Sequence, residues 1–118
     1  YRLDYETSGL MIYLKDEMLL KEIRKNFSEL VKTKFYLAVV SGNLESQKLT
    51  HKIKSSGAKG AVMQENEQGT LNEIIVEQVE YNSKEDLSLL KVSLIQGHRH
   101  QIRAQLSFSG HPILGDEL

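Results

Sequence analysis

The chain has 118 residues, 40% of them hydrophobic and 26% charged, which is typical of one globular domain and excludes a disordered or fibrous protein. It contains no cysteine, which excludes disulfides, thiolate nucleophiles and cysteine-ligated zinc. The net charge of −1 provides no overall electrostatic footprint for nucleic acid, so any such binding needs a local basic patch. No apolar run is long enough to span a membrane and no signal segment opens the chain, so we expect a cytoplasmic protein.

The two ends of the chain suggest a fragment. It begins at Tyr1 rather than at a methionine, and it stops at Leu118, directly after a Gly-Asp turn. We therefore expect residues 1–118 to form a single, partial domain that is truncated at both ends.

The first third of the chain predicts a strand, a helix and a second strand. Residues 10–15 are a compact apolar run that indicates a strand. Asp16 is a candidate helix cap. Apolar side chains at three- and four-residue spacing after it predict an amphipathic helix whose stripe belongs to the core: Leu19, Ile23, Phe27 and Leu30. Residues 34–41 are rich in β-forming side chains and end at Gly42, which predicts a strand followed by a turn.

The rest of the chain predicts four more strands and a second helix. The strands are expected at residues 48–53, 61–64, 70–80 and 87–95. Turns are expected at 55–57 and 82–86. After Gly97 the apolar period becomes helical, and Gly110 is placed to close this helix in the left-handed conformation. The fold class is therefore α+β, with a mixed, mostly antiparallel sheet and flanking helices.

Polar residues that can carry chemistry crowd into three segments. In the first, Asp4 is either a residue that binds backbone amides in a turn or a catalytic carboxylate on a rigid loop. In the second, residues 97–103, His98 and His100 form an H-x-H pair that is weak evidence for a metal. A cationic helix start, carrying Arg99 and Arg103, that receives phosphates or pairs with a carboxylate fits this segment better, and a solvated basic face is the alternative. The third, residues 110–116, indicates a structured turn.

Together these segments resemble the RluA/RluD-type RNA pseudouridine synthases. Residues 1–10, YRLDYETSGL, are similar to the family signature H-R-L-D-x-x-T-S-G-L. Residues 34–42 are similar to its K-x-Y-x-A-x-V-x-G strand. Residues 97–106 are similar to G-R-x-H-Q-I-R-x-H-L, and residues 110–116 to G-H-P-I-L-G-D. Four motifs in the family's order cover nearly the whole chain, and the resemblance implies the catalytic-domain fold of this family.

The resemblance also implies a site for the isomerisation of uridine to pseudouridine in ribosomal or transfer RNA. Asp4 matches the essential aspartate, Arg103 the arginine that pairs with it, and Tyr36 the tyrosine that stacks on the target base. The residues implied to contact RNA or the base are Arg2, Arg99, His100, Ile113 and Leu114. A uridine within RNA structure reaches such an aspartate only by leaving its stack, so base flipping is implied. No cofactor and no metal are implied, and we expect a monomer.

The departures of the chain from the family pattern include Tyr1 in place of a histidine and His98 in place of an arginine, although Arg99 follows His98. A non-catalytic RNA-binding module that retains the synthase fold is therefore a rival interpretation. A carboxylate glycosidase that uses Asp4 and Glu6 fits the bond being broken but explains none of the other motifs.

A local basic stretch is the candidate surface for RNA phosphates. Its members are Lys48, His51, Lys52, Lys54 and Lys59. The acidic residues that follow are expected to face away from it: Glu65, Glu67, Glu73, Glu77 and Glu80.

Overall fold

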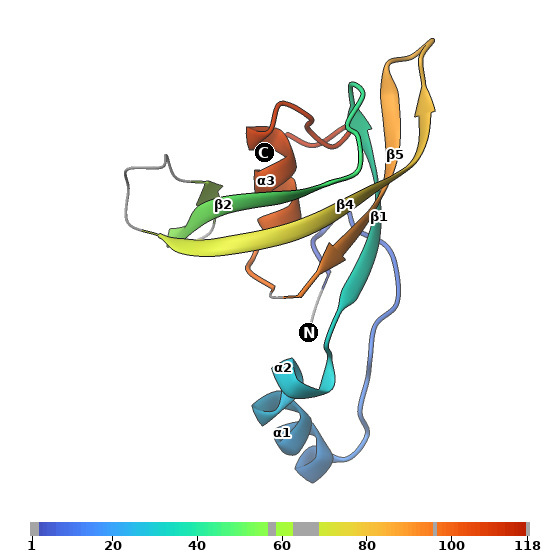
Figure 1. Ribbon diagram of the computed structural model, residues 1–118. Coiled ribbons are helices and arrows are strands. Elements are labelled where there is room, and N and C mark those ends of the chain that lie inside the picture. Colours follow the sequence, from blue (N-terminus) through green and yellow to red (C-terminus); the bar gives the residue numbers. More distant parts are fainter. Residues whose placement is uncertain (1–2, 57–58, 63–68, 96, 118) are drawn as a thin grey trace. The chain divides into compact units, whose positions relative to one another are not determined.

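The computed structural model describes residues 3–56, 59–62, 69–95 and 97–117 (Figure 1). The chain divides into two compact units, Tyr1–Lys32 and Thr33–Leu118. The first unit contains two short helices, α1 (Glu17–Lys25) and α2 (Phe27–Leu30). Asp16 caps α1 as predicted, because its side chain accepts a hydrogen bond of 2.8 Å from the backbone nitrogen of Leu19.

The predicted strand over residues 10–15 is wrong. This segment has no regular secondary structure and belongs to no strand of the sheet. A β-strand is stabilised by hydrogen bonds to a neighbouring strand, and among the described residues no strand pairs with this segment. An apolar run of β-forming residues is therefore not sufficient to form a strand here.

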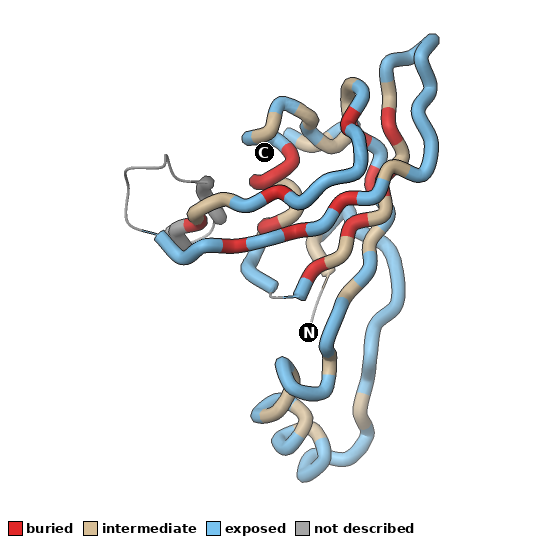
Figure 2. Tube along the Cα trace, in the orientation of Figure 1, coloured by how far each residue is buried: buried red, intermediate tan, exposed pale blue. Residues whose placement is uncertain are grey.

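The prediction that the helical stripe of the first unit belongs to the core is also wrong. None of the described residues of this unit is buried, and the side chains of Leu19 and Leu30 are 45% and 60% exposed (Figure 2). The helix ends at Lys25 and a second one starts at Phe27, so the four side chains no longer share one continuous stripe. An amphipathic helix buries its apolar face only against another apolar layer.

The second unit is an antiparallel sheet with one helix. Its strands lie in the order β1-β5-β4-β2-β3, and every pairing between them is antiparallel. The elements are β1 (Lys34–Ser41), β2 (Gln47–Ser56), β3 (Lys59–Val62), β4 (Thr70–Asn82), β5 (Leu87–Leu94) and α3 (Gln101–Phe108). The α+β class with an antiparallel sheet is confirmed.

Most strand predictions of this unit are confirmed. Alternating burial along β5, and along β4 as far as its irregularity at Gln78/Glu80, explains why periodicity located both strands. The loop at 82–86 is a tight hairpin in which the Asn82 side chain accepts from the backbone nitrogen of Lys84 at 3.0 Å. The strand expected at 61–64 is β3, and positions 63 and 64 lie outside the described residues. The turn expected at 55–57 is wrong for positions 55 and 56, because β2 continues through residue 56, and position 57 lies outside the described residues.

The core lies between α3 and one face of the sheet. Alternate side chains of the central strands point to this face, and Leu106 of α3 packs among them with no exposed surface. Figure 2 shows the buried positions concentrated along the strands and on α3. The fully or almost fully buried apolar residues are Val40, Ile74, Val76, Leu90, Val92 and Leu106. This packing fixes α3, which carries Arg103, against the sheet.

Candidate active site

Arg103 lies on α3 and forms a two-pronged ion pair with Asp116. Its Nε donates to Asp116 Oδ2 at 2.7 Å, and its Nη2 donates to Oδ1 at 2.5 Å. The two side chains are only 25% and 11% exposed. The Nη1 atom of Arg103 lies 2.9 Å from His100 Nδ1. Two contacts on different sides of the guanidinium therefore define the plane in which it lies.

The turn after α3 brings Asp116 back to Arg103. Gly110 closes the helix with φ of 83°, as the sequence predicts, and the chain then reverses. The backbone nitrogen of Leu114 donates to Val39 O of β1 at 2.8 Å, and that of Asp116 donates to Ile113 O at 3.0 Å. The turn over residues 110–116 is thus structured and attached to the end of β1.

His100 and Arg99 immediately precede α3. His100 is the N-cap and adopts a left-handed conformation with φ of 56°. Arg99 Nε lies 3.0 Å from His100 Nε2. A neutral imidazole has one acceptor nitrogen, so His100 accepts from Arg99 or from Arg103 at one time. Arg99 lies in the turn rather than on the helix, which corrects the expectation that the helix carries both arginines.

Tyr36 and Ile113 lie on the core side of the second unit. Tyr36 is on β1, opposite Val92 of β5, and is partly buried against the core cluster. Ile113 forms an isolated bridge with Val40 and also packs against that cluster. The Leu114 side chain is 58% exposed. Of the two residues expected to wall the base pocket, Ile113 is the one that the core holds in place.

Asp4 belongs to the first unit, where it starts a turn. The backbone nitrogen of Thr7 donates to Asp4 O at 3.0 Å, and the residue is partly buried. Arg2 lies outside the described residues.

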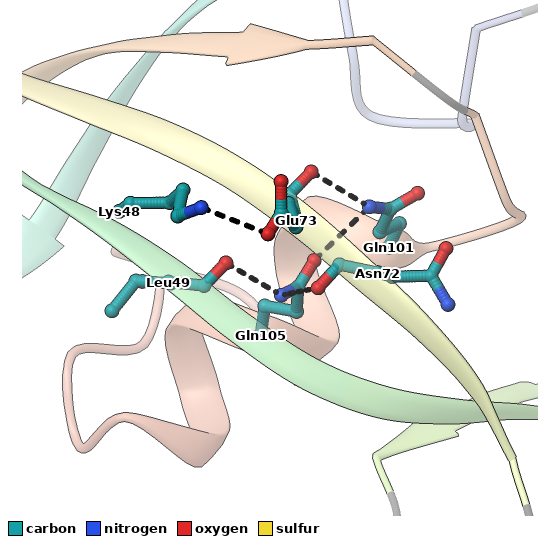
Figure 3. A network of polar contacts seen from close by, with 6 residues as sticks. All are labelled: Lys48, Leu49, Asn72, Glu73, Gln101 and Gln105. Atoms are coloured by element: carbon teal, nitrogen blue, oxygen red, sulfur yellow. Dashed lines mark hydrogen bonds and ion pairs between the residues drawn. The ribbon is translucent and has the colours of Figure 1, made fainter.

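Buried amides connect α3 to the sheet (Figure 3). Gln105 has no exposed surface, and its Nε2 lies 3.3 Å from Leu49 O of β2 and 3.2 Å from Asn72 O of β4. Gln101 donates to Gln105 Oε1 at 3.1 Å and to Glu73 O at 3.4 Å. Such amides are stable in a core because their hydrogen bonds replace those to water. No pattern in the sequence predicts this network, because the carbonyls that it uses lie on distant strands.

His51 faces this network from β2. Its Nδ1 lies 3.1 Å from Gln105 Nε2, and its ring makes an edge contact with Phe108 at 5.1 Å between centroids. Burial lowers the pKa of His51 from its ordinary value of 6.5. The side chain is thus favoured in its neutral form, which accepts a hydrogen bond at Nδ1.

The expected basic stretch is not one continuous surface. His51 points to the side of β2 that faces α3, whereas Lys48 and Lys52 alternate with it and point to the opposite side. Lys48 Nζ lies 2.9 Å from Glu73 Oε1, so the expectation that Glu73 faces away is wrong. β2 and β4 are antiparallel neighbours, and their register places Lys48 close to Glu73. The side chains of Lys54 and Lys59 are not described.

The described residues hold neither a cluster of metal ligands nor a helix that could span a membrane. Nowhere in it do three or more histidine, aspartate or glutamate side chains gather so that they could hold a metal ion. No helix within the described residues has the length and apolar character needed to cross a membrane.

The comparisons with known proteins agree on one family. The sequence profile described as RNA pseudouridylate synthase matches residues 1–108. An uncharacterised RNA pseudouridine synthase of Helicobacter pylori is 34% identical over 126 aligned positions, which cover 100% of this chain and 41% of that protein. Ribosomal large subunit pseudouridine synthase C of Vibrio parahaemolyticus is 30% identical over 99% of this chain and 37% of its own length. The chain thus spans about two fifths of these relatives.

Solved structures agree on the fold. The human RNA pseudouridylate synthase domain-containing proteins 1 and 4 superpose with a TM-score of 0.78 each, at 24% and 22% identity. The alignments cover 98% of this chain and 52% and 49% of those chains. The family profile extends over most of the chain, including the segments of Asp4, Tyr36 and Arg103. The chain belongs to the RNA pseudouridylate synthase family.

Proposed function

We propose that the protein to which this chain belongs isomerises specific uridines to pseudouridine in ribosomal or transfer RNA. The observation that carries the proposal is the family match over residues 1–108, a range that retains Asp4, Tyr36 and Arg103 together. The reaction exchanges the bond between uracil nitrogen and the sugar for a bond from carbon 5. It is intramolecular, and the proposal includes no cofactor. We further propose that the protein acts as a monomer in the cytoplasm.

Asp4 is the proposed catalytic carboxylate. It acts as a nucleophile or as a base at the sugar while the uracil detaches. The detached base rotates within a closed site, forms the bond from carbon 5, and loses the carbon-5 proton. Tyr36 is proposed to stack on the base and to take part in that proton transfer. Its partial burial against the core supports a fixed ring position.

The remaining residues are proposed to hold the RNA. The target uridine leaves its stack to reach the site, and Arg2 occupies the vacated space. Arg99, which is exposed, and His100 contact phosphate oxygens. Ile113 and Leu114 provide an apolar wall of the base pocket. The rival function is RNA binding without turnover, which the departure at Tyr1 favours.

The test is release of tritium from carbon-5-labelled uridine in bulk ribosomal and transfer RNA, with the full-length protein. Asp4→Asn is isosteric and removes the carboxylate, so we expect turnover to be lost while RNA binding is retained. The matched control is Glu6→Gln, the same chemical change at an exposed neighbouring position, which should retain wild-type turnover.

Each outcome separates the interpretations. Release by the wild type that vanishes only in Asp4→Asn supports the synthase. Equal loss in Glu6→Gln would mean that the Glu6 carboxylate is also needed for turnover. Free uracil that retains its tritium would point to the glycosidase, because that reaction leaves the carbon-5 hydrogen in place. RNA binding without any release by the wild type favours the non-catalytic module.

A further inference from the structure

We propose that Asp116 is a positioning residue that holds the Arg103 guanidinium in one orientation, with His100 as a second support. The inference rests on the proposed function for its catalytic consequence, because Arg103 is the proposed partner of the catalytic carboxylate. Its structural part stands on the contacts within the second unit alone. Asp116 thus affects the proposed reaction by orienting Arg103.

The geometry of the pair favours orientation over simple attraction. Both carboxylate oxygens of Asp116 are engaged, one by Nε and one by Nη2 of Arg103. A bidentate contact of this kind fixes both the distance and the plane of the guanidinium, which a single ion pair does not. Both side chains are largely shielded from water, so the pair is screened much less than an exposed one.

The contacts set the direction of the whole guanidinium. Its N–H groups lie in one rigid plane, so the contacts of Nε and Nη2 to Asp116 and of Nη1 to His100 also set the directions in which its other N–H groups point.

Asp116 is itself held by the backbone. Its nitrogen donates to Ile113 O at 3.0 Å, and the turn is attached to β1 on both sides of Ile113. On one side Ser41 N donates to Pro112 O at 3.0 Å, and on the other Leu114 N donates to Val39 O at 2.8 Å. Because β1 also carries Tyr36, these contacts connect the strand of one proposed catalytic residue to the side chain of another.

The test uses Asp116→Asn in the full-length protein, which preserves the shape of the side chain and removes its charge. The first readout is solvent exchange of the Arg103 Nε–H group, followed by nitrogen-15 NMR, which needs no activity. We expect exchange to become faster by an order of magnitude or more. The second readout is the single-turnover rate of pseudouridine formation, expected to fall about 10²-fold with RNA affinity unchanged, the size typical of a misplaced catalytic group.

Two comparisons make the assignment specific. In an Arg103→Lys background, Asp116→Asn should cause no further loss of rate, because the residue then has no guanidinium to orient. The matched control is Glu77→Gln, which removes an exposed carboxylate that pairs with Lys91 at 3.6 Å, and it should leave both readouts unchanged. If Asp116→Asn does not fold, Asp116→Glu is the second variant, and it should show faster exchange and an intermediate rate.

Unchanged exchange at Arg103 Nε–H in the Asp116 variant would overturn the inference whatever the activity. An undiminished further loss of rate in the Arg103→Lys background would also overturn it, because Asp116 would then act through another group. A wild-type protein without turnover would contradict the proposed function alone, and the exchange measurement would still decide the role of Asp116.

Discussion

Two glycines with nearly equal φ angles have different surroundings. Gly42 has φ of 82°, and a Cβ atom there would lie 3.0 Å from the ring nitrogen Nδ1 of His111. Gly110 has φ of 83°, and a Cβ atom there would meet nothing within 4 Å. His111 Nδ1 also donates to Ser41 O at 2.8 Å, so displacing the ring weakens the junction between β1 and the turn that ends at Asp116.

We therefore expect Gly42→Ala to destabilise the protein more than Gly110→Ala. The matched control, Gly110→Ala, should lower the free energy of unfolding by about 1–2 kcal/mol, the backbone cost of a left-handed residue with a side chain. Gly42→Ala has the same cost and must also move the imidazole. Urea unfolding of both variants measures the difference, and equal losses would show that His111 moves aside freely.

His51 gives the stability a pH dependence of known sign. Burial lowers its pKa below 6.5, so the unfolded chain takes up a proton at a higher pH than the folded protein does. This contribution to the free energy of unfolding is complete above pH 6.5 and is lost as the pH falls toward the pKa of the folded state. His51→Gln, which keeps a polar side chain next to Gln105, should make the thermal midpoint less dependent on pH in acid. Identical pH profiles for the two proteins would assign the titration to other groups.

At the level of elements, α3 is attached to the sheet by hydrogen bonds as well as by apolar packing. Gln105 reaches carbonyls on both β2 and β4, and Leu106 beside it has no exposed surface. The helix that carries Arg103 thus depends on a polar side chain in the core.

Gln105→Met tests this attachment, because it retains a long unbranched side chain but removes the donor. We expect the free energy of unfolding to fall by about 1–3 kcal/mol, since the acceptors that Gln105 satisfies become buried without partners. Ser107→Ala, on the exposed side of the same helix, is the matched control and should have little effect. Thermal or urea unfolding distinguishes the two. A loss no larger than that of Ser107→Ala would mean that apolar packing alone holds α3.

The helices and strands also show which sequence patterns are sufficient to predict an element. Periodicity located β4 and β5 because each alternates between a buried and an exposed face that its own residues define. The apolar run at 10–15 and the helical stripe of the first unit carried similar signals. Among the described residues, however, no strand pairs with the apolar run, and none in the first unit is buried. A local pattern indicates which side chains prefer burial. Only a second layer of structure that packs against them can bury them.

At the scale of the whole chain, a net charge of −1 means that the proposed RNA binding depends on a few local cations. Lys48 and Lys91 each lie beside a carboxylate, Glu73 and Glu77, which offsets part of their attraction for phosphate. Arg99 is exposed immediately before α3 and is the proposed phosphate contact.

We therefore expect RNA affinity to fall steeply with salt, and Arg99→Ala to reduce the slope of log K against log salt by about 1. The matched control is Lys84→Ala at the tip of the β4–β5 hairpin, which removes the same charge elsewhere and should preserve the slope. Filter binding or fluorescence titration over a salt series measures the slope for each protein. A slope that neither variant changes would remove Arg99 from the set of phosphate contacts.

The sequence by itself determined the fold class, most strands of the second unit, the helix that carries Arg103 and the motifs that resemble the family. These depend on residue identity and on periods of two or of three to four, which act within one element. The tertiary structure decided that Asp116 and His100 contact Arg103, that His51 and the glutamines meet in the core, and that Lys48 pairs with Glu73. Such contacts join residues that turns and strand register bring together, and no spacing along the chain records them.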